Sequence, residues 1–131
     1  MPFRPLPCPE IVLRAITKAG WLKNDRIVSA AFIWDRNRDP DGLSVNIASR
    51  TNVEEWLSGF RASSGADSLH SGRIRTLALD VGQTEEEQDD SHAIITGLPF
   101  IDDDPDKAEV LASRLVEMVR KVDRTKRTHR R

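Results

Sequence analysis

The stretch DPDGLSVNIASRTNVEEW, residues 39–56, contains a turn, a strand and the start of a helix in direct succession. In the turn, Pro40 fixes φ and Gly42 tolerates a positive φ. Residues 43–47 then alternate apolar and polar side chains, which is the pattern of a half-buried strand. The charged turn therefore joins this strand to an apolar run before it, and the two strands are expected to be antiparallel.

Two elements are predicted upstream of the turn. Residues 26–34 are rich in β-branched and aromatic side chains and are apolar on both faces, which predicts a strand in the centre of the sheet. Residues 9–19 predict a helix, because Pro9 suits the first helical position and apolar residues recur at helical spacing until Gly20.

Downstream of the turn, Thr51 and Glu54 have the spacing of a capping box. The short helix that they begin has an apolar stripe of Val53, Trp56, Leu57 and Phe60. Residues 61–72 are small, polar and rich in Gly and Ser, so they are expected to form a mobile loop. Residues 74–81 alternate as a half-buried strand, and residues 82–90 are an acidic, solvated connection.

The last part of the chain predicts one more strand and a long helix. Residues 91–97 form the strand, and residues 102–122 form a helix with acids at its start and bases at its end. Its docking face is Ala108, Leu111, Ala112, Leu115, Met118, Val119 and Val122. The order helix, strand, strand, helix, strand, strand, helix predicts an α+β fold, with a mainly antiparallel sheet of about four strands covered by helices. Residues 1–123 form one domain, and residues 124–131 are a basic, flexible tail.

The composition indicates a globular protein without strong attraction to any one class of partner. Hydrophobic residues make up 38% of the 131 residues, charged residues 31%, and the net charge is −1. No apolar run is long enough to span a membrane, so no membrane association and a cytoplasmic location are expected. With Cys8 as the one cysteine, neither an intramolecular disulfide nor a cysteine-based metal site can form. No phosphate-binding or dinucleotide-binding glycine motif is present, and we expect no cofactor.

The charged turn is the first candidate site. Arg36 and Arg38, with Asp41 and the adjoining Ser44, have the residue types of a ligand-binding or partner-binding loop. Together with Asp39, the two arginines have the chemistry of a phosphate or carboxylate clamp. The same residue types also suit a solvated turn between strands, since each favours turns for local reasons. The sequence leaves both interpretations open.

His92 is the best candidate for acid–base chemistry, because it alone among the histidines is predicted on a regular element. A structural or surface role is the alternative, since no serine or cysteine nucleophile motif accompanies it. His70 falls in the predicted loop and His129 in the tail, so their spacing gives no metal site. The aspartates that begin the last helix have the oxygen ligands for a divalent cation, but helix capping explains them without a metal. We expect no metal.

The basic tail is the third candidate, as a site for weak contact with nucleic acid. Residues 120–131 contain seven basic residues and one acid, whereas residues 85–107 contain nine acids and one base. The tail has no aromatic residue for stacking on bases, so it offers only diffuse attraction to phosphates. A solvated tail, or one that folds onto the acidic segment, is the alternative. The basic residues that we assign to the tail are Arg124, Lys126, Arg127, Arg130 and Arg131.

The segments DPDGLSVNIAS and HAIITGLPF together resemble a group of small bacterial proteins with no assigned activity. The resemblance covers most of residues 26–122. It implies a bacterial cytoplasmic origin and no particular reaction. It also implies one architectural or functional set, which consists of Arg36, Asp41, Gly42, Ser44, His92 and Pro99.

Two functions follow as hypotheses. The first is a small interaction module, such as an accessory or regulatory subunit that works with a bacterial partner protein. It accounts for a well-specified fold with charged loops and no assembled catalytic set. The second is an enzyme that acts on a phosphate-containing substrate, a nucleotide or RNA, with Arg36 and Arg38 on the phosphate and His92 as general acid or base. The sequence does not decide whether the protein is an enzyme, but the second hypothesis requires the charged turn to lie close to His92.

Overall fold

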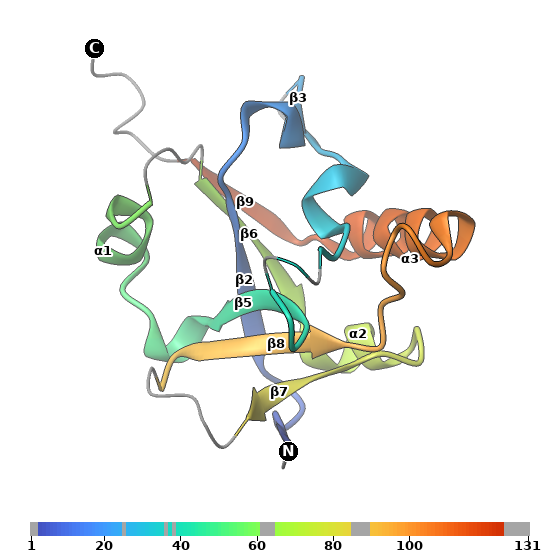
Figure 1. The fold of residues 1–131 in the computed structure, drawn as a ribbon. Helices are drawn as coiled ribbons and strands as arrows, with labels where there is room; N and C mark the ends of the chain where they lie inside the picture. Colours follow the sequence, from blue (N-terminus) through green and yellow to red (C-terminus); the bar gives the residue numbers. More distant parts are fainter. Residues whose placement is uncertain are drawn as a thin grey trace.

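The structure, a computed structural model, is built around one antiparallel sheet (Figure 1). It describes residues 3–24, 26–35, 37, 39–60, 65–84 and 90–124. Within these residues the sheet has seven strands, and all its pairings are antiparallel. Their spatial order is β1 (Phe3–Pro5), β7 (Asp80–Thr84), β8 (His92–Thr96), β5 (Leu43–Ile47), β2 (Ile11–Ile16), β6 (Gly65–His70) and β9 (Lys121–Arg124). The prediction of an α+β fold with a mainly antiparallel sheet is confirmed, although the sheet has more strands than expected.

Shorter elements surround the sheet. The helices are α1 (Val53–Ser58), α2 (Ser71–Arg75) and α3 (Pro105–Met118). Three 3-10 turns are η1 (Ala19–Trp21), η2 (Ser29–Phe32) and η3 (Ala48–Arg50), and a small hairpin pairs β3 (Leu22–Lys23) with β4 (Arg26–Ile27). Figure 1 shows α1 on one side of the sheet and α2 and α3 on the other.

The two faces of the sheet are buried to different extents. The main core lies on the face that α3 and η2 cover, and its largest fully buried side chains include Phe32, Ile95 and Leu115. On the opposite face, α1 packs a small second cluster, in which Leu57 contacts Ala15 and Ala66. The remainder of that second face, over β5 and β8, carries the polar residues described below.

The predicted helix at residues 9–19 is wrong, because the chain there forms the strand β2. Ile11, Val12 and Ile16 are β-branched, and the strand is paired on both sides, with β5 and with β6. Apolar side chains on both faces of a central strand produce adjacent apolar positions that also fit a helical stripe. Pairing with distant segments therefore determines that this stretch forms a strand and not a helix.

The predicted central strand at residues 26–34 is also wrong. Only Arg26 and Ile27 are in a strand, in the small hairpin, and η2 follows. Ala31 and Phe32 are buried in the main core beneath α3. This run is apolar because it covers the sheet, and a short apolar run does not by itself show whether it lies within a sheet or on top of it.

The predicted loop at residues 61–72 contains an interior strand instead. Residues 65–70 form β6, between β2 and β9, and α2 begins at Ser71. Small side chains are needed here because Ala66 lies directly beneath α1, against Leu57. The small residues of this segment suggested a mobile loop, but their small size instead allows close packing beneath α1. Residues 61–64 lie outside the described part of the chain.

The second half of the chain differs from the prediction at two further places. The strand predicted at residues 74–81 is instead the end of α2, a turn, and the start of β7, which extends to Thr84 in the supposed acidic connection. The last helix ends at Met118, and Val122 lies in β9 rather than on the helix. Arg124, the first residue of the predicted tail, is the last residue of β9.

Several local predictions are confirmed. The strands at residues 43–47 and 92–96 form as expected, as do the helices that begin at Val53 and Pro105. The cap of α1 differs in detail, because Asn52 Oδ1 accepts a hydrogen bond from Glu55 N at 3.0 Å. Thr51 instead donates its hydroxyl to the Ile47 carbonyl at 2.7 Å. These elements are the ones whose local signals agree with their tertiary surroundings.

Candidate functional site

The candidate site begins where β5 and β8 lie side by side. Asn46 is the Cα partner of His92, and Ser44 is the partner of Ile94, so Ser44, Asn46 and His92 share one face of the sheet. His92 Nε2 lies 3.2 Å from Ser44 Oγ. Ser44 Oγ donates a hydrogen bond to Asp39 Oδ1, also at 3.2 Å. The charged turn and the start of β8 therefore converge, as the enzyme hypothesis requires.

The direction of these hydrogen bonds limits what Ser44 can do. A serine hydroxyl has one proton, and here that proton is donated to the Asp39 carboxylate. His92 Nε2 must then be the donor toward Ser44 Oγ. A general base that activates a serine has to accept the serine proton instead. The chain His92–Ser44–Asp39 therefore anchors the turn and does not prepare Ser44 as a nucleophile.

The turn itself is held by its own backbone and by one tryptophan. Trp34 Nε1 donates to the Asp39 carbonyl at 2.7 Å, and Asp39 N donates to the Asp35 carbonyl at 2.9 Å. Gly42 has φ +154°, and a Cβ atom there would lie 2.7 Å from the Ile95 carbonyl oxygen. The turn thus packs against β8 so closely that only glycine fits. Hence the turn has a fixed place on the sheet rather than being only a solvated connection.

The other residues predicted for this turn have different positions. Asp41 is exposed on the outer side of the turn, and Pro99 is half-buried beyond the end of β8. Arg36 and Arg38 lie outside the described residues, so their role as a clamp stays a prediction. Asn37, which separates them, is exposed, and its backbone N–H donates to Asp35 Oδ1 at 3.0 Å.

A row of polar groups, which the sequence analysis did not identify, continues from His92. Asn46 is buried, and its Nδ2 donates to Ser91 Oγ at 3.2 Å. Gln83 Nε2 donates to the Asp90 and His92 carbonyls, both at 2.9 Å. Next to these residues, Arg50 forms a 3.2 Å ion pair with Asp90. We call Ser44, Asn46, Ser91 and His92 the polar row. Gln83 holds the backbone of this row through its hydrogen bonds to the Asp90 and His92 carbonyls. In the sequence, the row was indicated only by the polar positions of two alternating strands.

A second feature that the sequence analysis missed lies on the opposite face, inside the main core. Arg14 and Asp67 are Cα partners across β2 and β6, and their exposed fractions are 6% and 0%. Arg14 donates from Nε to the Ala31 carbonyl at 2.9 Å and from NH1 to the Ser44 carbonyl at 2.8 Å. Its guanidinium carbon lies 5.1 Å from the centre of the Trp21 ring.

Asp67 has no comparable hydrogen bonds. Neither carboxylate oxygen has a hydrogen-bond partner within the part of the chain that the structure describes. Burial raises the pKa of Asp67 from its ordinary value of 3.8 to about 7, while the nearby charge of Arg14 opposes that rise. Asp67 therefore changes its charge close to neutral pH, two strands away from the polar row.

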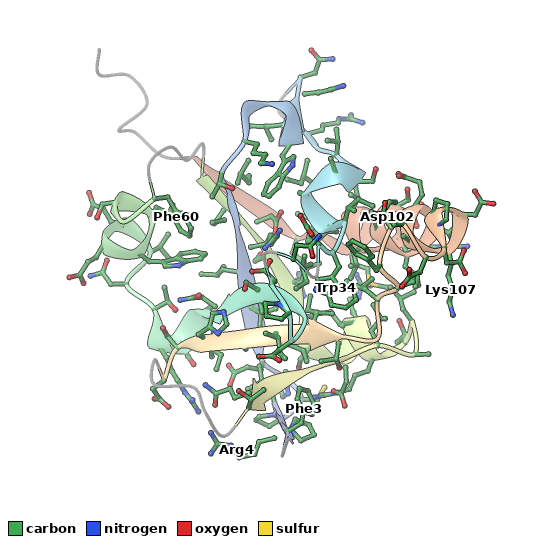
Figure 2. All side chains as sticks on the ribbon, in the orientation of Figure 1. Phe3, Arg4, Trp34, Phe60, Asp102 and Lys107 are labelled. Carbon is green, nitrogen blue, oxygen red and sulfur yellow. The ribbon has the colours of Figure 1, made fainter. Side chains whose placement is uncertain are left out.

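His70 and Asp104 have local structural roles. His70 Nδ1 accepts a hydrogen bond from Gly72 N at 3.0 Å and so caps α2. Asp104 caps α3 by accepting from Lys107 N at 3.2 Å. Figure 2 shows Asp102 and Lys107 at the α3 end of the molecule, away from Phe60 beside α1. Among residues 3–124, apart from the masked positions, no group of three His, Cys, Asp or Glu side chains is placed to hold a metal ion.

Of the predicted basic tail, the described residues include only Arg124. Arg124 is part of β9, opposite Gly65 in β6. Lys126, Arg127, Arg130 and Arg131, like His129, lie outside the described residues. Contact with nucleic acid through them stays a prediction. No helix within the described ranges is long and apolar enough to cross a membrane.

The fold and the site together define an α+β domain with an anchored charged turn and a polar row on one sheet face. Comparison of the chain with protein-family models, with curated proteins and with solved structures gave no match. The function is therefore inferred from the geometry of these residues.

Proposed function

We propose that this chain is a small interaction module, an accessory or regulatory subunit that binds a bacterial partner protein. Its binding surface is the anchored turn, of which the structure describes residues 35, 37 and 39–42, together with the polar row. The observation that carries the proposal is the hydrogen-bonded chain from His92 through Ser44 to Asp39. This chain fixes a charged turn on a rigid sheet, which is a common location for recognition residues.

Fixed polar groups favour binding because they are already ordered before the partner arrives. Ordering a flexible side chain or loop at an interface costs roughly 0.5–1.5 kcal/mol for each side chain immobilised. Asp39 and Ser44 have already lost that freedom in the free protein, through bonds to each other and to Trp34. Exposed Asn37 and Asp41 remain on the outer side of the turn for contact with a partner.

The first test is a charge reversal on the turn. In Asp41→Arg we expect at least about a tenfold loss of affinity for the partner, equivalent to about 1.4 kcal/mol, because the substitution places the opposite charge at the interface. The partner is first captured with the tagged wild-type chain in its native host and identified by mass spectrometry. Its affinity for the purified wild type and variant is then measured.

Asp102→Arg is the matched control, since Asp102 is also an exposed aspartate in a turn and lies at the α3 end of the molecule (Figure 2). It is expected to bind like the wild type. Equal binding of the partner by both variants would show that the interface does not include the turn. Recovery of the wild-type chain alone at native expression would oppose the whole proposal.

A second candidate function is supported by the convergence of the turn with His92. The turn that contains Arg36 and Arg38 is bonded, through Asp39 and Ser44, to the imidazole proposed as general acid or base. An enzyme acting on a nucleotide or RNA would hold the phosphate with the arginines and would use the His92 imidazole for proton transfer.

This second function predicts that a nucleoside monophosphate shifts the NMR signals of the His92 ring in the wild type. Arg38→Ala should abolish the shift, because the arginine fork supplies the phosphate contacts. Arg114→Ala, an exposed arginine on α3, is the control and should leave the shift intact. If the His92 signals do not respond to nucleotide or to short RNA, the binding-module function stands without this rival.

A further inference from the structure

We infer that Arg14 is a positioning residue for the candidate site, and that the protonation state of Asp67 determines how firmly Arg14 holds that site in place. The inference concerns regulation of the surface proposed above, and its relevance to a partner rests on the proposed function. The physical coupling between Asp67 and the turn can be tested without any partner.

Arg14 connects three segments that no other described side chain connects. It lies on β2, and its guanidinium donates to the Ala31 carbonyl in η2 and to the Ser44 carbonyl in β5. The ladder between β2 and β5 has Cα partners only at Val12–Ile47 and Leu13–Asn46. Toward the turn, the Arg14 side chain therefore supplies a link between these two strands where the ladder does not.

Ser44 is the residue at which this link meets the candidate site. Its carbonyl oxygen accepts from Arg14, and its hydroxyl lies between Asp39 and His92. Ala31, the second acceptor, lies in η2 shortly before Trp34, whose indole holds the Asp39 carbonyl. Arg14 thus supports the turn at both of its ends, through η2 before it and through β5 after it.

Asp67 competes with these carbonyl groups for Arg14. While Asp67 carries its proton it is neutral, and the guanidinium keeps its hydrogen bonds to the two carbonyls and its contact with the Trp21 ring. When Asp67 loses its proton, a fully buried anion lies on the same sheet face as Arg14 and attracts the guanidinium strongly. Movement of Arg14 toward Asp67 weakens its hold on Ala31 and Ser44. The turn is then less firmly fixed.

Among the side chains that the structure describes, few other charges face Asp67. From β2 the charged neighbour is Arg14, and the Lys18 ammonium lies over the Trp21 ring, 5.9 Å from its centre. On β9, the Cα partner of Asp67 is Val122. The core residues that η2 and α3 contribute are apolar: Ala31, Phe32, Ala112 and Leu115. Because the pKa of Asp67 is about 7, its change of charge falls within the physiological range.

Three tryptophans report on this coupling separately. Trp21 stacks on Arg14, and Trp34 donates its indole N–H to the turn. Trp56, which lies in α1, packs against Phe60. In a ¹H–¹⁵N NMR titration from pH 5.5 to 8.5, we expect the Trp21 and Trp34 indole signals to shift with one common midpoint near pH 7. The Trp56 signal should not shift with them. In Asp67→Asn, which is similar in shape and cannot ionise, the Trp21 and Trp34 signals should be independent of pH.

His92→Gln is the matched control, because His92 is a second ionisable side chain and it contacts Ser44. Glutamine can still donate to Ser44 but has no charge change, so the transition should persist in this variant. The inference would be overturned if the pH-dependent shift of the Trp21 and Trp34 signals persisted in Asp67→Asn, or if it were lost in His92→Gln.

A direct measurement on the wild type does not depend on any variant folding. The side-chain carboxyl carbon of Asp67 should titrate with the same midpoint as the two indoles. A midpoint in the ordinary aspartate range would refute the coupling. These outcomes are independent of the partner experiment, since the Asp41→Arg test can fail while the titration succeeds, and the reverse.

Discussion

Replacing Arg14 by methionine is expected to lower the free energy of unfolding by about 3–5 kcal/mol at pH 8, the usual cost of leaving a buried charge without its partner. Asp67 is fully buried beside Arg14, and with a pKa of about 7 it is mostly ionised at pH 8. Methionine keeps an apolar stem but offers no charge and no donor. Urea unfolding of the wild type and the variant at pH 8 gives the difference directly.

The same substitution should cost less at pH 5.5, because Asp67 then retains its proton and no buried anion is left alone. The remaining loss comes from the Ala31 and Ser44 carbonyls, which no longer have their donor. Arg50→Met is the control, since the side chain of Arg50 is 40% exposed in its ion pair with Asp90. Its cost should be no more than about 1 kcal/mol at either pH. A loss for Arg14→Met that is equal at the two pH values would contradict this explanation.

The free energy of unfolding of the wild type should also depend on pH, because of Asp67. The pKa of Asp67 is about 7 in the folded chain, against 3.8 for an exposed aspartate. Because the folded state holds this proton more tightly than the unfolded state, the contribution of Asp67 to stability is complete below about pH 4. That contribution is lost as the pH rises through 7.

Truncation of Phe32 to alanine is the second change with a large expected effect, a loss of about 3–5 kcal/mol in the free energy of unfolding. Phe32 is 1% exposed and lies in η2, where it fills the main core between the sheet and α3. Removing its ring leaves a cavity that α3 and β5 cannot close without breaking their own contacts. Thermal or urea unfolding at one fixed pH measures the loss.

Phe60→Ala removes the same ring from the second cluster and serves as the control (Figure 2). Phe60 is only half-buried, so its loss should be clearly smaller than that of Phe32. Equal losses would mean that η2 does not fill the core as described. They would also weaken the argument that the segment before the turn is held in place by packing.

The sequence predicted those elements whose local pattern and tertiary surroundings agree. The strand at residues 43–47 is flanked by a glycine turn, and α3 has an acidic, proline-containing start and a single apolar face. β2 was predicted wrongly because Ile11, Val12, Ala15 and Ile16 fit both a helix and a doubly covered strand. Only pairing with two distant segments distinguishes the two. β6 was missed because small residues were interpreted as mobility, when they serve close packing under α1.

The candidate site was predicted in part for the same reason. Ser44 and His92 lie on the polar phase of two strands, and the charged turn lies next to Ser44, so the sequence identified both without showing their contact. Arg14 and Asp67 were not predicted, since each is a charged residue within a segment that was assigned wrongly. Their pairing depends on the register between β2 and β6, which local patterns do not contain.

The position of β2 in the sheet has a consequence for how the chain acquires its structure. β2 is near the start of the chain, yet its two neighbours are β5 and β6, and α3 covers the sheet only after both have been made. Each of these pairings closes a long loop before any contact compensates for the entropy lost. During synthesis, the apolar residues of β2 therefore leave the ribosome well before their partners exist. An apolar strand from the interior of the finished sheet thus stays without its partners during much of synthesis, and it is a segment on which a chaperone would act early.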